Sequence, residues 1–390
     1  MTSGRVPVLW LCGPPGVGKT TVSWQLFAEL SQAGVQVAFA DADQLGMCFP
    51  APPEDPNCAQ LKARNVGALI PNYAAASAKC VILSGSIDPL AGVRRELMPD
   101  AAVTVVRLRA DHDEVVRRFL GRDEHWEDLD QIIHEIRDEA EGMDESVFAD
   151  VCIETTAVPA SKVPDLVRES CHEWPGFRGT LGQQEVPALA NAYSEATRTD
   201  GHILLICGPT GVGKSTIAFR LYMQYLNAGL TAGYVDLDQI GFISPARPDD
   251  PGDHRLKARN LAAMWRNYHA GGATCLIATA PIESDRALQT YRDAFPKATV
   301  TLCRLHASPQ ELTRRIMSRG AGGSWPQPGD PLRGKSDEYL RAIAAQAITA
   351  DSAFEREGIG PARIDTDGHT PDESAGMIAA ATGWPQQPGG

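Results

Sequence analysis

The sequence predicts an α/β fold made of two similar halves, each a parallel sheet covered by helices on both faces. Three observations predict it. The chain has 390 residues, which is enough for two or three domains with cores of their own. A set of motifs occurs twice in the same order, and this indicates an internal repeat. Within each half, apolar strand-like stretches alternate with helix-like ones, which predicts right-handed crossovers between parallel strands.

The repeat is aligned by four landmarks that recur 195 residues further along the chain. They are GPPGVGKT (13–20) with GPTGVGKS (208–215), DADQLG (41–46) with DLDQIG (236–241), LKARN (61–65) with LKARN (256–260), and Asn72-Tyr73 with Asn267-Tyr268. The second half gains about fourteen residues after Arg319, in a stretch rich in Gly and Pro that predicts a mobile loop. We therefore predict domains at 1–175 and 201–385, a linker at 176–200 and a tail at 386–390.

The elements of each half follow one order. An apolar strand, 6–12 or 202–207, leads into the Gly-rich loop and then into a helix with apolar residues at helical spacing. Next come a strand that ends in the acidic motif, a helix through LKARN, two further strands and a charged helix. The later strands are expected at 35–43, 80–86 and 103–110, and at 231–238, 275–281 and 300–307.

The Gly-rich loops are complete matches to the pattern GxxxxGK[ST]. Between a strand and a helix, such a loop presents backbone N–H groups to phosphate oxygens, and the helix adds the positive end of its dipole. Lys19 and Lys214 then reach the β and γ phosphates, and the hydroxyls of Thr20 and Ser215 are the expected Mg²⁺ ligands. A structural glycine turn is the alternative, but two matches in the right context favour nucleotide binding. The residues expected to hold the nucleotide are Gly13, Gly16, Val17, Gly18, Lys19, Thr20 and Thr21, and Gly208, Gly211, Val212, Gly213, Lys214, Ser215 and Thr216.

Two acidic pairs, Asp41 with Asp43 and Asp236 with Asp238, end the second strand of each half. This edge of a doubly wound sheet is where ligands bind. Since residues i and i+2 of a strand point to the same side, we expect both carboxylates of a pair to face one site. One would take a proton from a substrate hydroxyl or help to hold Mg²⁺, and the other would orient the acceptor. The alternative is that Asp simply favours turns at strand ends.

The LKARN segment is identical in the two halves, while its flanks differ. Helical spacing puts Lys62 and Asn65 on one face, and likewise Lys257 and Asn260. We predict that these four residues bind the acceptor. A solvated polar face is the alternative.

The charged helix of each half carries two arginines four residues apart, Arg118 with Arg122 and Arg315 with Arg319. Stacked on one face, each pair is placed to close over a triphosphate as a lid and to stabilise charge during phosphoryl transfer. A surface helix held by ion pairs is the alternative. The lids differ in charge, because residues 111–154 contain 16 acidic and 4 basic residues. Such a surface repels phosphates, so we predict that the second half is the likelier catalyst.

Composition narrows the partners. The net charge of -13 argues against a nucleic-acid backbone, which basic clusters would bind. No apolar run approaches the length of a membrane span, and the first residues do not read as a secretory leader. Nine cysteines are scattered without metal-ligand spacing, which indicates reduced thiols and a cytoplasmic protein. We expect a small-molecule partner, no nucleic acid and no membrane; the sequence predicts no oligomeric state.

Together these motifs resemble the small P-loop kinases of metabolites, such as adenylylsulfate kinase, shikimate kinase, gluconate kinase and chloramphenicol phosphotransferase. The resemblance covers most of each half and includes a late segment, IDTDGHTPDE (364–373). It implies two homologous P-loop NTPase domains of the nucleoside-monophosphate-kinase-like type, with ATP and Mg²⁺ as cofactors. It also implies that Thr366 and Gly368 lie near the adenine. The tandem arrangement departs from these kinases, which are usually single-domain chains.

The sequence leaves three hypotheses about function. The first is an ATP- and Mg²⁺-dependent kinase that moves the γ-phosphoryl group to a hydroxyl of a small metabolite. The second is a regulatory or assembly protein gated by nucleotide, which needs no small-molecule acceptor. A third reading, a polynucleotide 5′-hydroxyl kinase, has the right loop but the wrong charge.

Overall fold

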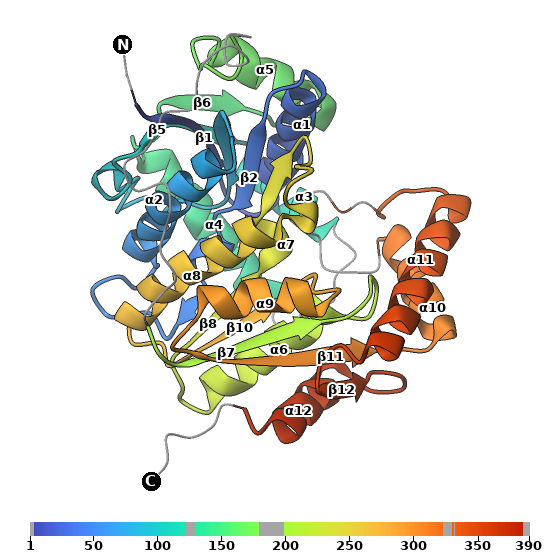
Figure 1. Ribbon diagram of the computed structural model, residues 1–390. Helices are drawn as coiled ribbons and strands as arrows, with labels where there is room; N and C mark the ends of the chain where they lie inside the picture. Colours follow the sequence, from blue (N-terminus) through green and yellow to red (C-terminus); the bar gives the residue numbers. More distant parts are fainter. Residues whose placement is uncertain (1–3, 122–128, 179–198, 323–329, 331, 385–390) are drawn as a thin grey trace. The chain divides into compact units, whose positions relative to one another are not determined.

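The computed structural model describes residues 4–121, 129–178, 199–322, 330 and 332–384 (Figure 1). Apart from its ends, the predicted linker lies outside the described residues, and so does the whole of the predicted tail. Among the described residues, no helix combines the length and the apolar character that a membrane span requires.

The chain forms two compact units, and neither is one continuous segment. The first unit comprises Met1–Gly46, Glu54–Ser194 and Gln239–Leu256, and the second comprises Met47–Pro53, Glu195–Asp238 and Lys257–Gly390. The boundaries predicted from the repeat assign each half of the sequence to one domain. Each compact unit also contains a short segment from the other half of the sequence.

The first unit is built on a six-stranded sheet in the order β6-β5-β1-β4-β2-β9. The strands from β6 to β2 run parallel, and β9 joins the β2 edge antiparallel. Its strands are β1 (Val6–Cys12), β2 (Val37–Asp41), β4 (Cys80–Ser84), β5 (Ala101–Arg109), β6 (Val151–Glu154) and β9 (Phe242–Ser244). Its helices are α1 (Lys19–Gln32), α2 (Ala59–Ala75), α3 (His112–Leu120), α4 (Leu129–Glu145) and α5 (Val163–Ser170).

The second unit has a sheet of corresponding order, β12-β11-β7-β10-β8-β3. Here β3 is the antiparallel strand, added to the β8 edge. Its strands are β3 (Cys48–Phe49), β7 (His202–Cys207), β8 (Ala232–Asp236), β10 (Cys275–Thr279), β11 (Thr299–His306) and β12 (Ala362–Asp365). The helices of the second half are α6 (Lys214–Asn227), α7 (Leu237–Ile240), α8 (His254–Ala270), α9 (Asp285–Ala294), α10 (Pro309–Gly320), α11 (Asp337–Glu357) and α12 (Pro371–Thr382).

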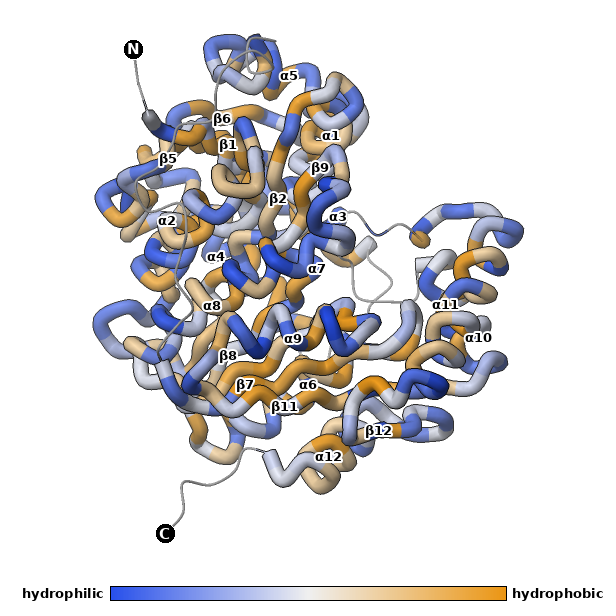
Figure 2. The backbone as a smooth tube through the Cα atoms, viewed as in Figure 1, coloured by the Kyte–Doolittle hydropathy of each residue, from blue (hydrophilic) through white to orange (hydrophobic). Residues whose placement is uncertain are grey.

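Apolar strands form the core of each unit. In the first, Leu9 and Leu11 of β1 pack in one cluster with Leu26 of α1 and Val167 of α5. In the second, Leu204 and other β7 residues pack with α6, and the hydropathy colouring shows β7 and β11 as largely hydrophobic (Figure 2). Because helices cover both faces of a parallel sheet, its strands are near-continuous apolar runs, and this is why they could be predicted.

Glycine has a defined role in the two phosphate loops. Gly18 and Gly213, immediately before α1 and α6, have φ angles of 98° and 101°, which favour glycine. At Gly16 a Cβ atom would lie 2.5 Å from the Val115 carbonyl oxygen of α3. The loop therefore needs glycine both for its backbone conformation and for its close approach to the lid helix.

The acidic pairs differ from the prediction in one respect. Asp41 and Asp236 end β2 and β8, but Asp43 follows the strand in a turn and Asp238 lies in α7. The two carboxylates of a pair are therefore not strand neighbours at i and i+2. The reason is local: the Asp41 and Asp236 carboxylates accept hydrogen bonds from the backbone N–H of Asp43 and Asp238, and these bonds turn the chain.

Part of the predicted mobile loop after Arg319 lies outside the described residues, namely 323–329 and 331. In the part that is described, Leu332 is buried in the core cluster of the second unit and Asp330 pairs with Arg319. The stretch thus contains an anchored portion, which its Gly and Pro content did not predict.

Candidate functional site

The phosphate loop of the second unit connects β7 to α6. Lys214, the first residue of α6, donates hydrogen bonds to the carbonyl oxygens of Gly208 at 2.9 Å and Pro209 at 3.1 Å. Burial lowers the pKa of Lys214, while Asp238 and Asp236 oppose the shift. The ammonium group thus lies over its own loop, where a phosphate would replace two carbonyl partners.

The hydroxyl of Ser215 lies against the acidic pair. It donates a 2.6 Å hydrogen bond to Asp236, which ends β8 and is buried. Burial raises the pKa of Asp236, and the neighbouring Asp238 carboxylate raises it further. Thr279, at the end of β10, also hydrogen-bonds Asp236. A buried carboxylate beside a hydroxyl at the carboxyl edge of the sheet is an arrangement of hard oxygen donors that fits Mg²⁺.

Lys257 joins the acidic pair to the LKARN helix. Its Nζ atom lies 2.8 Å from Oδ1 of Asp238, and the Asp238 side chain is 47% exposed. Asp236 therefore faces the phosphate loop, whereas Asp238 keeps an exposed carboxylate that is oriented by a lysine. Asn260, one turn beyond Lys257, is fully buried.

The first unit repeats the pairing of this lysine with the second aspartate of the acidic pair. Lys62 donates to Asp43 Oδ1 at 3.2 Å and to the Ser86 carbonyl oxygen at 3.1 Å. Asn65 is buried and donates a 2.6 Å hydrogen bond to the Leu45 carbonyl oxygen. Its amide therefore holds the turn after the acidic pair, a structural use of a residue predicted to bind the acceptor.

The two carboxyl groups of the first acidic pair have pKa values shifted in opposite directions, upward for Asp41 and downward for Asp43. Burial, followed by the Asp43 charge, raises the pKa of Asp41 to about 7. Burial would also raise the pKa of Asp43, but Lys62 and Lys19 outweigh it and lower that pKa. The two lysines thus favour a charged Asp43 beside an Asp41 that holds its proton more tightly than an ordinary carboxyl group.

The predicted lid arginines of the second unit, Arg315 and Arg319, form hydrogen bonds with other residues of the unit. Arg315 donates from Nη1 to the Val212 carbonyl oxygen at 2.8 Å and from Nη2 to the Thr366 carbonyl oxygen at 3.0 Å. Its Nε atom bonds Glu311, one helical turn earlier. Arg319 bonds Asp330 at 2.8 Å. Arg315 thus connects α10 to the phosphate loop and to the segment after β12.

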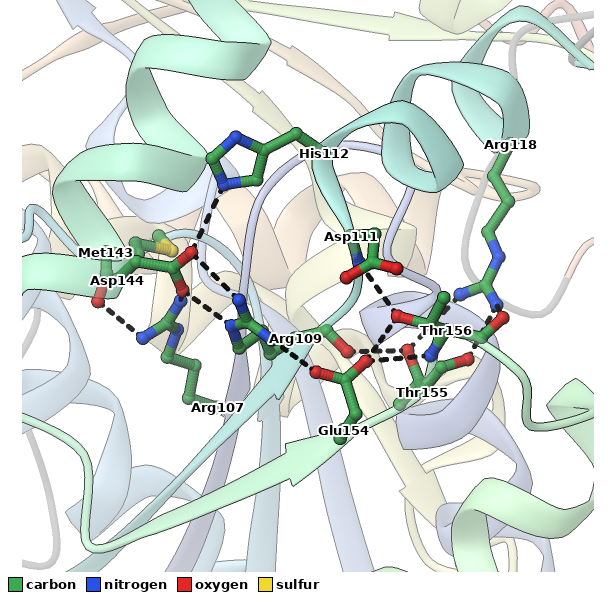
Figure 3. Close-up of polar contacts among 10 residues, drawn as sticks. All are labelled: Arg107, Arg109, Asp111, His112, Arg118, Met143, Asp144, Glu154, Thr155 and Thr156. Carbon is green, nitrogen blue, oxygen red and sulfur yellow. Dashed lines mark hydrogen bonds and ion pairs between the residues drawn. The ribbon is translucent and has the colours of Figure 1, made fainter.

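In the first unit Arg118 donates hydrogen bonds to Glu114 of the same helix and to the Thr155 carbonyl oxygen, and the second of these is drawn in Figure 3. Figure 3 also shows Arg107 and Arg109 converging on Asp144 of α4, with His112 at the same carboxylate. Arg122, the second arginine predicted for this lid, lies outside the described residues.

The segment predicted near adenine lies between β12 and α12. Thr366 is buried, and its hydroxyl donates to the His306 carbonyl oxygen at 2.9 Å. Gly368 has a φ of 72° and nothing within 4 Å of the place where a Cβ would lie. Asp367, between them, caps the start of α10 by accepting from the Ser308 N–H at 3.0 Å. Arg315 and this segment are therefore neighbours, and the place of the adenine beside Thr366 and Gly368 stays a prediction.

One site residue was missed by the sequence reasoning. Glu139 of α4 faces the predicted site of the first unit: it hydrogen-bonds Ser86 and interacts with Lys19, Lys62 and Asp43. Burial raises its pKa, and its Oε1 atom has no hydrogen-bond partner in the described part of the chain. The excess of acid in this lid was the only signal, and it could not say which carboxylate points inward.

The second lid has no such carboxylate at this position. The offset of 211 that aligns Ile153 with Ile364 puts Ala350 of α11 where α4 has Glu139. The two units therefore differ at the candidate phosphate site itself and not only in the net charge of their lids.

A separate cavity of about 550 Å³ lies in the second unit between the start of α10 and the second half of α11. Its lining includes His306, Asp351 and Arg363, with His306 Nδ1 2.6 Å from Asp351 Oδ2. No predicted site residue lines it.

Comparisons with known proteins give one family and several solved structures. Residues 9–143 match the family AAA_18, described as an AAA domain. No curated protein matches the chain. A Janibacter sugar kinase is 17% identical with a TM-score of 0.31, and the match covers 44% of this chain and 98% of that one.

Two further structures are similar to the same extent. The APS kinase of Mycobacterium tuberculosis, in complex with AMPPNP and APS, is 17% identical, with a TM-score of 0.33 and coverage of 47% of this chain and 97% of that one. The shikimate kinase of Bacteroides thetaiotaomicron is 15% identical, with a TM-score of 0.31 and coverage of 46% and 97%. These proteins belong to the group of small-metabolite kinases that the motifs resemble.

Proposed function

We propose that this chain is an ATP- and Mg²⁺-dependent phosphotransferase that moves the γ-phosphoryl group to a hydroxyl of a small metabolite. The two homologous P-loop halves, residues 1–175 and 201–385, would each carry a nucleotide site and catalytic residues. The observation that carries the proposal is the linked set of Lys214, Ser215 and Asp236 on one side and Asp238 with Lys257 on the other. A phosphate loop and an exposed, lysine-oriented carboxylate meet there at one sheet edge.

Each group of the second unit has a part in this reaction. Lys214 and the loop amides hold the β and γ phosphates, and Lys214 exchanges the Gly208 and Pro209 carbonyl oxygens for phosphate oxygens. Ser215 and Asp236 would hold Mg²⁺, which when bound neutralises charge on the phosphates. Catalysis rests on positioning and electrostatics, because phosphoryl transfer requires no covalent intermediate with the protein.

Asp238 orients the acceptor hydroxyl and accepts its proton. Two contrasts support this role for Asp238 over Asp236: the Asp238 side chain is 47% exposed, and it is paired with Lys257. Asp236 is buried and already bonded to Ser215. Arg315 and Arg319 would move from Thr366 and Asp330 onto the phosphates when the lid closes.

The equivalent set in the first unit is Lys19, Thr20, Asp41, Asp43 and Lys62. Glu139 lies close enough to interact with Lys19 and thus competes with phosphate for this lysine. Nucleotide binding is therefore weaker in the first unit, and the second is the main catalyst.

A regulatory or assembly NTPase is the second candidate, and Glu139 is the observation that favours it. A lid carboxylate that acts on the phosphate-loop lysine of one unit and has no counterpart in the other lid suits one site that senses nucleotide and one that turns it over. Dependence of ATP consumption on an added hydroxyl compound distinguishes the two. Strict dependence indicates a kinase, and turnover without acceptor indicates a switch.

The decisive experiment is a metabolite-library screen for phosphate transfer from ATP, with Lys19→Ala and Lys214→Ala measured beside the wild type. We expect transfer to a small hydroxyl compound that Lys214→Ala abolishes and Lys19→Ala only reduces. Unchanged transfer in Lys214→Ala would exclude the second unit as the catalyst.

The proposed partner is a small molecule in the cytoplasm, with neither nucleic acid nor a membrane as substrate. The net charge of -13 and nine free cysteine thiols support this proposal. A filter-binding assay with an oligonucleotide checks whether nucleic acid is a partner, because salt-sensitive binding of the oligonucleotide would contradict this proposal.

A further inference from the structure

Each acidic pair is followed by a segment that belongs to the compact unit of the other half. After Gly46 the chain enters the second unit as Met47–Pro53, and after Asp238 it enters the first unit as Gln239–Leu256. These two stretches, the exchanged segments, occupy equivalent places in the repeat. The exchange is therefore reciprocal.

In the first unit the exchanged segment forms β9, the edge strand beside β2. Phe39 pairs with Phe242, and Val37 with Ser244, in antiparallel register. The ring of Phe242 lies 4.9 Å from that of Trp24 and 6.1 Å from that of Phe39, both at edge-to-face angles. A strand from the second half of the sequence thus closes an aromatic cluster of the first.

Three hydrogen bonds hold the same segment. The buried Tyr73 hydroxyl donates to the Ile240 carbonyl oxygen at 2.6 Å. The hydroxyls of Ser31 and Ser244 lie 2.6 Å apart, and Gln36 donates to the Pro245 carbonyl oxygen at 2.7 Å. These side chains come from α1, from α2 and from the residue just before β2, so the contact is broader than one strand.

In the second unit the exchanged segment forms β3, the edge strand beside β8. Cys48 pairs with Gly233, and the Tyr234 N–H donates to the Met47 carbonyl oxygen at 2.9 Å. Met47 packs against the apolar core of that unit. Without this segment the β8 edge would present unpaired backbone groups, a surface that other strands can bind.

We infer that the edges of β2 and β8 are docking surfaces whose partners are the exchanged segments 239–256 and 47–53 of this same chain. Neither half of the sequence contains all of a compact unit. The halves therefore depend on each other for folding, and they stay associated without the covalent linker. The inference does not depend on nucleotide binding or catalysis.

The first test uses the full chain with a protease site introduced within 179–198. After native folding and complete cleavage, we expect both fragments to elute together at the mass of one chain, and to separate only in denaturant. Elution as two separate folded fragments would overturn the inference. Elution at the mass of two chains would also overturn it, because the segments would then be exchanged between copies.

The second test asks which half responds to a change in an exchanged segment. In Phe242→Ala, hydrogen exchange should become roughly tenfold faster in the peptides that cover 22–39, which lie in the other half of the sequence. The matched control is Phe219→Ala, a change in the same half of the sequence. Phe219 packs on Tyr222 and Tyr234, so this change should speed exchange in 217–236 instead.

Faster exchange in 202–236 alone for Phe242→Ala would contradict the inference. This readout is local, so it distinguishes a lost docking contact from a general loss of stability, which would speed exchange in both units.

Discussion

Ser215 donates a 2.6 Å hydrogen bond to Asp236, whereas Thr20, its counterpart in the first half, accepts a 3.3 Å hydrogen bond from Ser84. The same position of the phosphate loop is therefore joined directly to the acidic pair in one unit and to a neutral hydroxyl in the other. If Mg²⁺ binds through a hydroxyl and a nearby carboxylate, the second unit has these donors already adjacent.

Removal of this contact should impair phosphoryl transfer. We expect Ser215→Ala and Asp236→Asn each to lower kcat by about 100-fold or more at fixed Mg²⁺, because charge on the phosphates loses its stabilising groups. The measurement is steady-state turnover across a Mg²⁺ titration. Thr20→Ala is the matched control and should change turnover much less. An equal loss in both units would contradict the unequal roles proposed for them.

Asp41 should make stability fall as pH rises. Its pKa is raised to about 7 in the folded chain from an ordinary value of 3.8, so the folded state binds the extra proton between these values. Its stabilising contribution is complete below about pH 4 and is lost as pH rises through 7. Asp41→Asn should therefore gain about 2 kcal/mol relative to wild type at pH 8. Urea unfolding at pH 5 and pH 8 measures this difference.

Asp43→Asn is the control for the pH prediction, because its sign is opposite. The pKa of Asp43 is lowered, so its contribution is present at neutral pH and is lost as pH falls through that lowered value. Loss of stability at pH 8 in both variants would show that the charge of Asp41, and not its proton, is favoured by the fold.

Glu139 should weaken nucleotide binding to the first unit. We expect Glu139→Ala, made in a Lys214→Ala background to isolate that site, to bind ATP roughly tenfold more tightly, because a charge facing Lys19 is removed. Because burial raises the pKa of Glu139, the affinity of the unsubstituted site should also rise as pH falls and this carboxylate becomes neutral.

Calorimetric titration with ATP measures both effects. Glu135→Ala is the control, since Glu135 lies on the same helix but is exposed. Equal affinity of the Glu139→Ala and Glu135→Ala variants would show that Glu139 does not compete with phosphate.

Arg315 should contribute to the stability of the second unit. It connects Glu311, the Val212 carbonyl oxygen and Thr366, so Arg315→Ala removes charged hydrogen bonds from three segments. We expect a loss of about 2–3 kcal/mol in the free energy of unfolding. Among the described residues the adjacent Arg314 pairs locally, with Glu311, and its side chain is 67% exposed. Arg314→Ala should cost less than about 1 kcal/mol in urea unfolding, and equal losses would contradict this account.

Local patterns explain what could be predicted from the sequence. Both phosphate loops, the strands before them and the helices after them follow from residues adjacent in the chain, because glycine at positive φ and apolar runs are local signals. The corresponding order of the two sheets agrees with the repeat in the sequence. The roles assigned to Lys19, Lys214 and the acidic pairs remain predictions that the experiments above test.

The tertiary structure decided the features that depend on distant partners. Asn65 binds the Leu45 carbonyl oxygen, Arg315 binds Val212 and Thr366, and the charge of Lys19 acts on the pKa of Glu139. A spacing rule puts a side chain on a face of a helix, but it does not say what that face meets. These interacting residues lie between 20 and about 120 positions apart in the chain, so no local pattern could identify them.

The sequence by itself determined that this chain has two phosphate loops in two α/β halves. Only the tertiary structure decided that each of the two short strands β3 and β9 joins the sheet of the other half. Strand β9 pairs with β2 in the first sheet, and β3 pairs with β8 in the second. Strands of two and three residues carry no periodicity of their own. Their pairing is chosen by backbone hydrogen bonds to an edge far away in the chain, and that choice is made only when the whole chain folds.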